Sequence, residues 1–144
     1  MGDTVGVAAT LYERVGGEAF FTALVERFYA GVATDARLRP LYPDDLEPSK
    51  RHLALFLAQY FGGPPVYAAE RGHPRLRLRH VPFAIGRAER DAWLEHMQAS
   101  VAASGAAAED AAALLSYFEM AATSLVNTLS DGLRPNQELG FRRG

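Results

Sequence analysis

Residues 71–83 read RGHPRLRLRHVPF, which sets His80 between a run of arginines and an apolar Val-Pro-Phe step. The arginines alternate with leucines, and this period of two would suit a β-strand, but the sequence offers no second strand to pair with it. We therefore predict a loop that tightens into a short helix around His80 and ends near Pro82, because proline breaks a helix interior. An irregular stretch of roughly 20 residues in a compact domain is normally functional or disordered, and the interleaved leucines fit disorder poorly.

Helical periodicity appears on both sides of this loop. Apolar residues spaced three and four positions apart mark one face of each of four segments, which predicts four main helices and an all-α domain. We expect these helices at Glu18–Ala33, from Ser49 to the Gly62-Gly63-Pro64-Pro65 stop, at Arg87–Ser104, and from about Ala108 with a core face that reaches Leu125 and Leu129. Thr10 and Glu13 have the spacing of a capping box, so a short helix should precede the first of these and end at Gly16-Gly17.

Prolines shape the connections. Pro40 and Pro43 each disfavour the helical conformation in the residue before them, so the segment 40–43 is predicted to be non-helical, with Tyr42 at a corner. Thr34 or Asp35 can cap a short turn ahead of it. After Pro65 the chain is predicted to be mostly loop as far as His80.

Composition bounds the class of protein. The chain has 144 residues, 49% of them hydrophobic and 22% charged, which fits one globular domain. We expect this domain at residues 10–129, with flexible extensions at 1–9 and 130–144. The formal net charge of −2 gives no case for nucleic acid as a partner. The absence of cysteine excludes disulfides, thiolate metal sites and haem attachment through Cys-x-x-Cys-His. We see no basic leader and no apolar run of ~20 residues, so no membrane span and a cytoplasmic location are expected.

Histidine is the remaining candidate metal ligand. No two of the four histidines have the spacing that places two ligands on one helix face, which disfavours zinc and di-iron sites. We expect His52 at a pocket rim, His73 in a structural role and His96 at the surface. His80 has a direction-fixing proline, apolar neighbours, and arginines whose guanidinium groups suit carboxylates. Together these features favour a macrocyclic metal cofactor, although each alone is typical of a structural histidine in a solvated basic loop.

Three polar aromatic residues could face such a cofactor. Tyr29 and Tyr42 are expected to point inward, where a buried phenol needs a partner, either a nearby carbonyl or a bound ligand. Trp93 lies near the start of a predicted helix, and its indole N–H can donate but never accept. Such donors suit dioxygen, which draws negative charge from ferrous iron. A single core tryptophan is otherwise commonplace.

The ordered set of motifs resembles the group II, or O-type, truncated haemoglobins from about Leu11 to Asn127. The motifs are Val15-Gly16-Gly17, Arg27-Phe28-Tyr29, Leu41-Tyr42-Pro43, Phe61-Gly62-Gly63-Pro64, the stretch from Arg71 to His80, Pro82-Phe83, Glu89-Arg90-Asp91-Ala92-Trp93 and the segment from Glu119 to Asn127. The resemblance implies a two-over-two helical sandwich around haem. It also implies that His80 is the iron ligand and that Tyr29, Tyr42 and Trp93 form the polar side above the haem.

The same resemblance assigns the remaining contacts of the haem. Leu53 would pack over the haem face, and Ser49 would stand at the position that is histidine in many ordinary globins. Further apolar wall would come from Phe56, Leu57, Phe61, Phe83, Met97 and Met120. The propionates would meet Arg79, Tyr67 and either Lys50 or Arg77.

Three functions are compatible with these residues. The first is a non-covalent haem b protein that binds dioxygen, CO or NO reversibly, for storage or transport. The second is a haem redox enzyme, a nitric oxide dioxygenase or a peroxidase-like enzyme, which would need a separate electron-donating reductase. The third is a cofactor-free helical interaction module in which His80 is structural. A homodimer is left open in each case.

Overall fold

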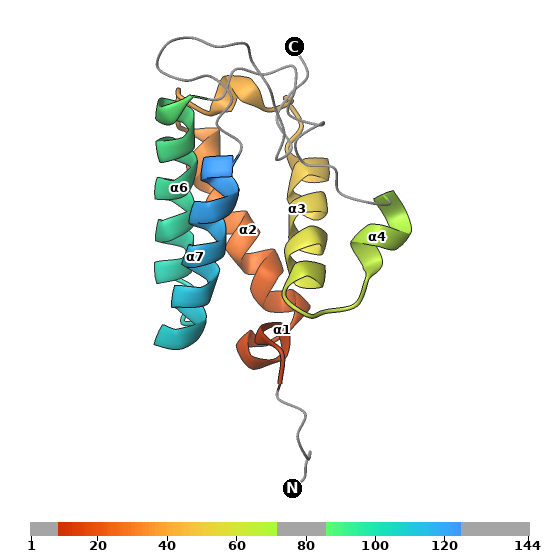
Figure 1. Cartoon of the computed structure of the whole chain (residues 1–144). Coiled ribbons are helices and arrows are strands. Elements are labelled where there is room, and N and C mark those ends of the chain that lie inside the picture. The colour runs from red at the N-terminus through yellow and green to blue at the C-terminus, as the bar shows by residue number, and fades with distance from the viewer. Residues whose placement is uncertain (1–8, 72–85, 125–144) are drawn as a thin grey trace, which may run out of the picture.

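The computed structural model describes residues 9–71 and 86–124, and within those ranges it contains helices and turns but no β-strand. The elements are α1 (Leu11–Val15), α2 (Glu18–Ala33), the 3₁₀ helix Arg39–Leu41, α3 (Glu47–Tyr60), α4 (Val66–Arg71), α6 (Arg87–Ala102) and α7 (Ala108–Ser124) (Figure 1). The all-α prediction is confirmed, and the predicted bounds of α2 are confirmed at both ends.

The capping box predicted at the start of α1 is confirmed. The Glu13 N–H donates to Thr10 Oγ1 over 3.1 Å, and the Thr10 N–H donates to Glu13 Oε1 over 3.1 Å. Gly16 ends the helix at a φ of 110°, in the left-handed region that favours glycine. The Tyr12 N–H donates to the Phe61 carbonyl over 3.0 Å, which fastens α1 to the end of α3.

Two pairs of helices build the core. α2 packs against α3 and α6, and α6 packs against α7, which gives the predicted two-over-two arrangement (Figure 1). The largest buried apolar side chains of this core are Phe21, Leu24, Phe28, Leu38, Leu57, Met97, Leu114 and Phe118. Burial of one such side chain stabilises a fold by about 1.5–3 kcal/mol, whereas an exposed ion pair contributes about 0–1 kcal/mol. The apolar seam between the helix pairs therefore holds the domain together.

The corner before α3 differs in part from its prediction. Pro40 lies within the 3₁₀ helix Arg39–Leu41, where a non-helical segment was expected. Proline is tolerated in a first helical turn because its missing N–H would have no partner there. Tyr42 follows with an extended backbone at φ −114° and ψ 155°, so the predicted corner is confirmed at this residue.

Prolines also explain two corrections around α3 and α4. α3 begins at Glu47, ahead of the expected Ser49, and carries Pro48 in its first turn. α4 forms over Val66–Arg71, where a loop was expected, and begins directly after Pro65, whose carbonyl accepts from the backbone of the new helix. Both departures follow from one rule, since proline stops a preceding helix but readily starts the next.

The second helix pair agrees with its prediction where it is described. α6 begins at Arg87 as predicted and ends at Ala102, two residues before the expected Ser104, and α7 begins at Ala108. The predicted loop from residue 72 to Phe83, the core positions Leu125 and Leu129, and the extensions at 1–8 and 130–144 lie outside the described residues. These stay predictions.

Candidate functional site

Three polar aromatic side chains converge in the core. Tyr29 comes from α2, Tyr42 from the extended residue after the 3₁₀ helix, and Trp93 from α6, and their exposed fractions are 1%, 0% and 3%. The Tyr29 and Tyr42 rings meet edge to face with centroids 5.4 Å apart. Phe28 lies between the two sides of the group, 5.0 Å from the Tyr29 ring and 5.3 Å from the Trp93 ring. Elements distant in sequence thus bring three hydrogen-bonding groups into one interior region.

Two of these polar groups have no protein partner in the described part of the chain. The Tyr29 hydroxyl and the Trp93 Nε1 are buried, and neither makes a hydrogen bond there. A buried polar group without a partner costs about 1–3 kcal/mol, so native proteins keep few of them. Two unpartnered polar groups in one core fit a protein that uses them to donate hydrogen bonds to a bound ligand.

Burial keeps both tyrosines protonated. It raises the pKa of the Tyr29 phenol well above its ordinary value, and the neighbouring hydroxyls of Ser49 and Tyr42 offset only part of that rise. Burial also raises the pKa of the Tyr42 phenol. The neighbouring Tyr29 raises this pKa further, and the Trp93 indole N–H lowers it in part. At neutral pH the two phenols therefore carry O–H groups that can donate, beside an indole that can only donate. Such a region suits a small, electron-rich acceptor.

The side chains predicted as apolar wall are unequally buried. Those in the core or packed against it are Leu53, Phe56, Leu57, Phe61 and Met97. Tyr67 of α4, predicted to reach a propionate, is 3% exposed and meets the Phe56 ring edge to face at 5.4 Å. Met120 is 60% exposed on α7 and so forms no part of the described core. Its assignment to the wall stays a prediction.

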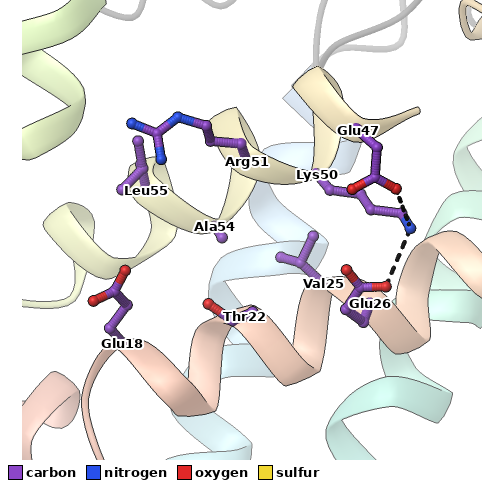
Figure 2. Close-up of a pocket in the computed structure, with 9 residues that line it drawn as sticks. All are labelled: Glu18, Thr22, Val25, Glu26, Glu47, Lys50, Arg51, Ala54 and Leu55. Atoms are coloured by element: carbon purple, nitrogen blue, oxygen red, sulfur yellow. Dashed lines mark hydrogen bonds and ion pairs between the residues drawn. The ribbon is translucent and has the colours of Figure 1, made fainter. Parts of the chain in front are cut away.

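Lys50 has different partners from the predicted one. Its Nζ donates to Glu26 Oε1 over 3.1 Å and to Glu47 Oε2 over 3.0 Å. Figure 2 shows this ammonium joining α3 to α2 at one end of a groove between the two helices, and none of the residues that line the groove belongs to the Tyr29 group. Two carboxylates pair with the lysine in this structure, and its contact with a propionate stays a prediction.

His96 is part of a charged network, which corrects its prediction as a surface residue. Its Nε2 lies 2.6 Å from Asp35 Oδ2, and its side chain is only 24% exposed. Arg37 donates to the same carboxylate from its backbone N–H over 2.8 Å and from Nε over 3.0 Å, and reaches Glu95 over 3.0 Å. Arg37 first and His96 second hold the pKa of the Asp35 carboxyl well below its usual range. The network ties α6 to the end of α2.

The residues predicted to bind the metal and most of the propionate contacts lie outside the described residues. They are His80 as the metal ligand and Arg77 and Arg79 as propionate contacts; Phe83 of the predicted apolar wall and His73, predicted to be structural, also lie outside the described residues. His52 is half-buried on α3. The structure therefore describes the polar side of the predicted site and leaves its iron-binding side as a prediction.

Residues 10–127 match the family described as bacterial-like globin. The chain belongs to this family. It is similar to the group 2 truncated hemoglobin YjbI of Bacillus subtilis, with 41% identity over 116 residues that cover 81% of this chain and 87% of the relative. This likeness places it with the group II truncated haemoglobins.

Solved structures show the same fold. The hemoglobin of the thermophilic phototroph Chloroflexus aurantiacus superposes with a TM-score of 0.82 at 53% identity, over 83% of this globin and 99% of that chain. The group II truncated hemoglobin of Bacillus anthracis gives a TM-score of 0.82 at 36% identity, over 85% and 95% of the two chains. The truncated-globin prediction is thereby confirmed, and membership of the family implies a haem cofactor. Within residues 9–71 and 86–124, no helix combines the length and apolar character that a membrane span requires.

Proposed function

We propose that this truncated haemoglobin holds haem b non-covalently and binds dioxygen reversibly, with CO and NO as further ligands. The observation that carries the proposal is the buried group of Tyr29, Tyr42 and Trp93, in which two polar atoms have no partner in the described part of the protein. Haem, when bound, supplies an iron that takes up a diatomic ligand. The protein supplies the surroundings that decide how long the ligand stays.

The residues present fit such a group. Unpartnered buried donors on one side match a ligand that accepts hydrogen bonds, and Leu57 and Met97 add buried apolar surface to the same core. We assign iron ligation to His80 and propionate contacts to Arg79 and Arg77, because a guanidinium fork matches a carboxylate. Tyr67 keeps its proposed place beside a propionate.

The pocket residues act by donating hydrogen bonds. A hydrogen bond to a charged acceptor is worth about 1.5–3 kcal/mol, and it is stronger where water is excluded. Tyr29 and Trp93 are almost fully buried, so their donors are desolvated before any ligand arrives. Donors fixed in advance lower the cost of ordering on binding. We therefore expect slow ligand release, which suits storage better than bulk delivery.

Reversibility is the property that tests this function. The reduced protein would be cycled between oxygen and argon while its visible spectrum is recorded. We expect the oxygenated spectrum to return to the deoxygenated one through repeated cycles. Stoichiometric conversion to the ferric form in the first cycle, with no recoverable oxygenated species, would contradict reversible binding while leaving haem binding intact.

A further inference from the structure

A continuous chain of aromatic rings leads from the buried group of Tyr29, Tyr42 and Trp93 to the protein surface. The Trp93 ring on α6 meets Phe118 on α7 at 5.9 Å between centroids, and Phe118 meets its neighbour Tyr117 at 5.7 Å. Tyr117 then meets Tyr60 at the end of α3, where the centroids are 4.2 Å apart and the planes differ by 34°. Rings at such separations are in direct contact. Three helices thus contribute one unbroken path of π systems.

The two ends of this ring chain lie in opposite environments. Trp93 is 3% exposed and Phe118 is 0% exposed, whereas Tyr60 is 52% exposed. Among the described residues, Tyr60 is one of three exposed large hydrophobic side chains, and it is the only aromatic one of the three. Its neighbours Phe61 and Tyr117 hold the ring in place, with Phe61 at 5.0 Å. Ring contacts therefore join an oxidisable ring at the surface, Tyr60, to an oxidisable ring in the core, Trp93.

We propose that this ring chain carries oxidising equivalents from the pocket to Tyr60, where the protein exchanges single electrons with its surroundings. The proposal rests on the haem function above and extends it to reaction with hydrogen peroxide. Tryptophan and tyrosine side chains can each lose an electron to a strong oxidant, and Phe118 provides contact between them without being oxidised itself. The rate of electron tunnelling falls steeply with distance. Several short steps between touching rings are therefore faster than one long step from Trp93 to Tyr60.

Proton release decides where the oxidising equivalent stops. A phenol that loses an electron must also lose its proton. Burial raises the pKa of Tyr117 well above its ordinary value, with Tyr60 adding to the rise, so Tyr117 gives up a proton reluctantly. The Tyr29 hydroxyl is buried beside the neutral hydroxyls of Ser49 and Tyr42, so it cannot release its proton directly to water. Tyr60 can release its proton directly to water. The phenoxyl radical therefore settles on Tyr60.

The electron balance of the overall reaction is complete. Hydrogen peroxide takes up two electrons and two protons and becomes two water molecules, which breaks its O–O bond. Tyr60 on each of two protein molecules supplies one electron and one proton. The two phenoxyl radicals then join through a carbon–carbon bond between their rings, and the displaced ring hydrogens return to the hydroxyl oxygens. The products are one dityrosine cross-link and two waters.

The test treats the haem-loaded full-length protein with hydrogen peroxide and maps the cross-links. Covalent dimer would be followed by denaturing gel and by dityrosine fluorescence, and the linked peptides would be identified by mass spectrometry. We expect a dimer joined through Tyr60. Tyr60→Phe should lose it almost completely, and Tyr117→Phe, which keeps the packing but removes one oxidisable ring, should slow it several-fold. Tyr12→Phe is the matched control, because Tyr12 reaches the same cluster only through the phenylalanines Phe21 and Phe61.

The outcomes separate the two proposals. Protein that takes up no haem, as its Soret absorbance would show, refutes the haem function and this inference with it. Haem-loaded protein that forms no dimer, or that forms it equally well without the Tyr60 hydroxyl, overturns the inference alone. An unchanged rate in Tyr117→Phe, or an equal loss in Tyr12→Phe, also overturns it, because the path would then lie elsewhere.

Discussion

Replacement of Trp93 by phenylalanine separates the role of its N–H from the role of its ring. Phenylalanine keeps an aromatic ring against Phe28 and Phe118, whose centroids lie 5.3 and 5.9 Å from that of Trp93. The change removes Nε1, which is buried and has no partner in the described residues. The ligand-free protein should therefore be little destabilised, because the loss of an unsatisfied donor, about 1–3 kcal/mol, offsets the loss of apolar area.

The liganded protein should respond much more strongly. A hydrogen bond from Trp93 to a charged or strongly polarised ligand is worth about 1.5–3 kcal/mol, and a factor of ten in rate corresponds to about 1.4 kcal/mol. Trp93→Phe should therefore release dioxygen roughly 10- to 100-fold faster than the unmodified protein. Carbon monoxide accepts hydrogen bonds weakly, so its release rate should change far less.

Two stopped-flow experiments measure the two release rates. Carbon monoxide release is measured by mixing the carbonyl form with excess nitric oxide, and dioxygen release as follows. The oxygenated protein is mixed with excess carbon monoxide and a scavenger of free dioxygen, and the replacement is followed by absorbance. Urea unfolding of the haem-free chain gives the stability of each variant. If Trp93→Phe releases dioxygen at the unmodified rate, the indole does not stabilise the ligand. If both gases accelerate equally, the effect is steric and the hydrogen-bond argument fails.

Two further predictions concern the network between α2 and α6. A Cβ at Gly31 would lie 2.3 Å from His96 Nδ1. Gly31→Ala should therefore destabilise the protein by about 1–2 kcal/mol in urea unfolding. In a His96→Ala background the clash is gone, so the same substitution should destabilise the protein less or should stabilise it. Asp35→Asn should also destabilise the protein at neutral pH, because a neutral amide cannot balance the charge of Arg37. The pKa of Asp35 is lowered on folding, so the carboxylate contributes fully above its ordinary value of 3.8 and less as the pH falls further. The difference in free energy of unfolding between Asp35→Asn and the unmodified protein should thus become smaller as the pH falls. A difference that stays constant down to about pH 2 would show that the charge of Asp35 is not responsible.

Local chemistry made much of the fold predictable. The bounds of α2 follow from apolar spacing, and α1 begins where a threonine and a glutamate three residues apart satisfy each other's backbone groups. α4 was missed because a segment as short as Val66–Arg71 is too brief for helical periodicity to appear. Its sequence signal was the pair of prolines ahead of it, which can stop one helix and start another.

A site residue could be predicted from the sequence only where the residues next to it form a recognisable motif. Tyr29 and Trp93 sit in recognisable motifs on helices, and the structure buries both. The contacts of His96 with Asp35 and of Tyr60 with Tyr117 join residues far apart in sequence, and helix packing alone creates them. One signal was available, since Gly31 in the interior of α2 indicates a close approach by a neighbouring group.

Titration of the haem-free protein with haemin shows whether haem binds beside the buried group of Tyr29, Tyr42 and Trp93. Trp93 is the only tryptophan in the chain and lies in the proposed haem pocket, so its fluorescence reports on binding. If haem binds beside Trp93, this fluorescence falls and a Soret band rises together, with both changes ending at one haemin per chain. Fluorescence that persists at equimolar haemin, with no Soret band beyond that of free haemin, would contradict the assignment of Tyr29, Tyr42 and Trp93 to a haem ligand pocket.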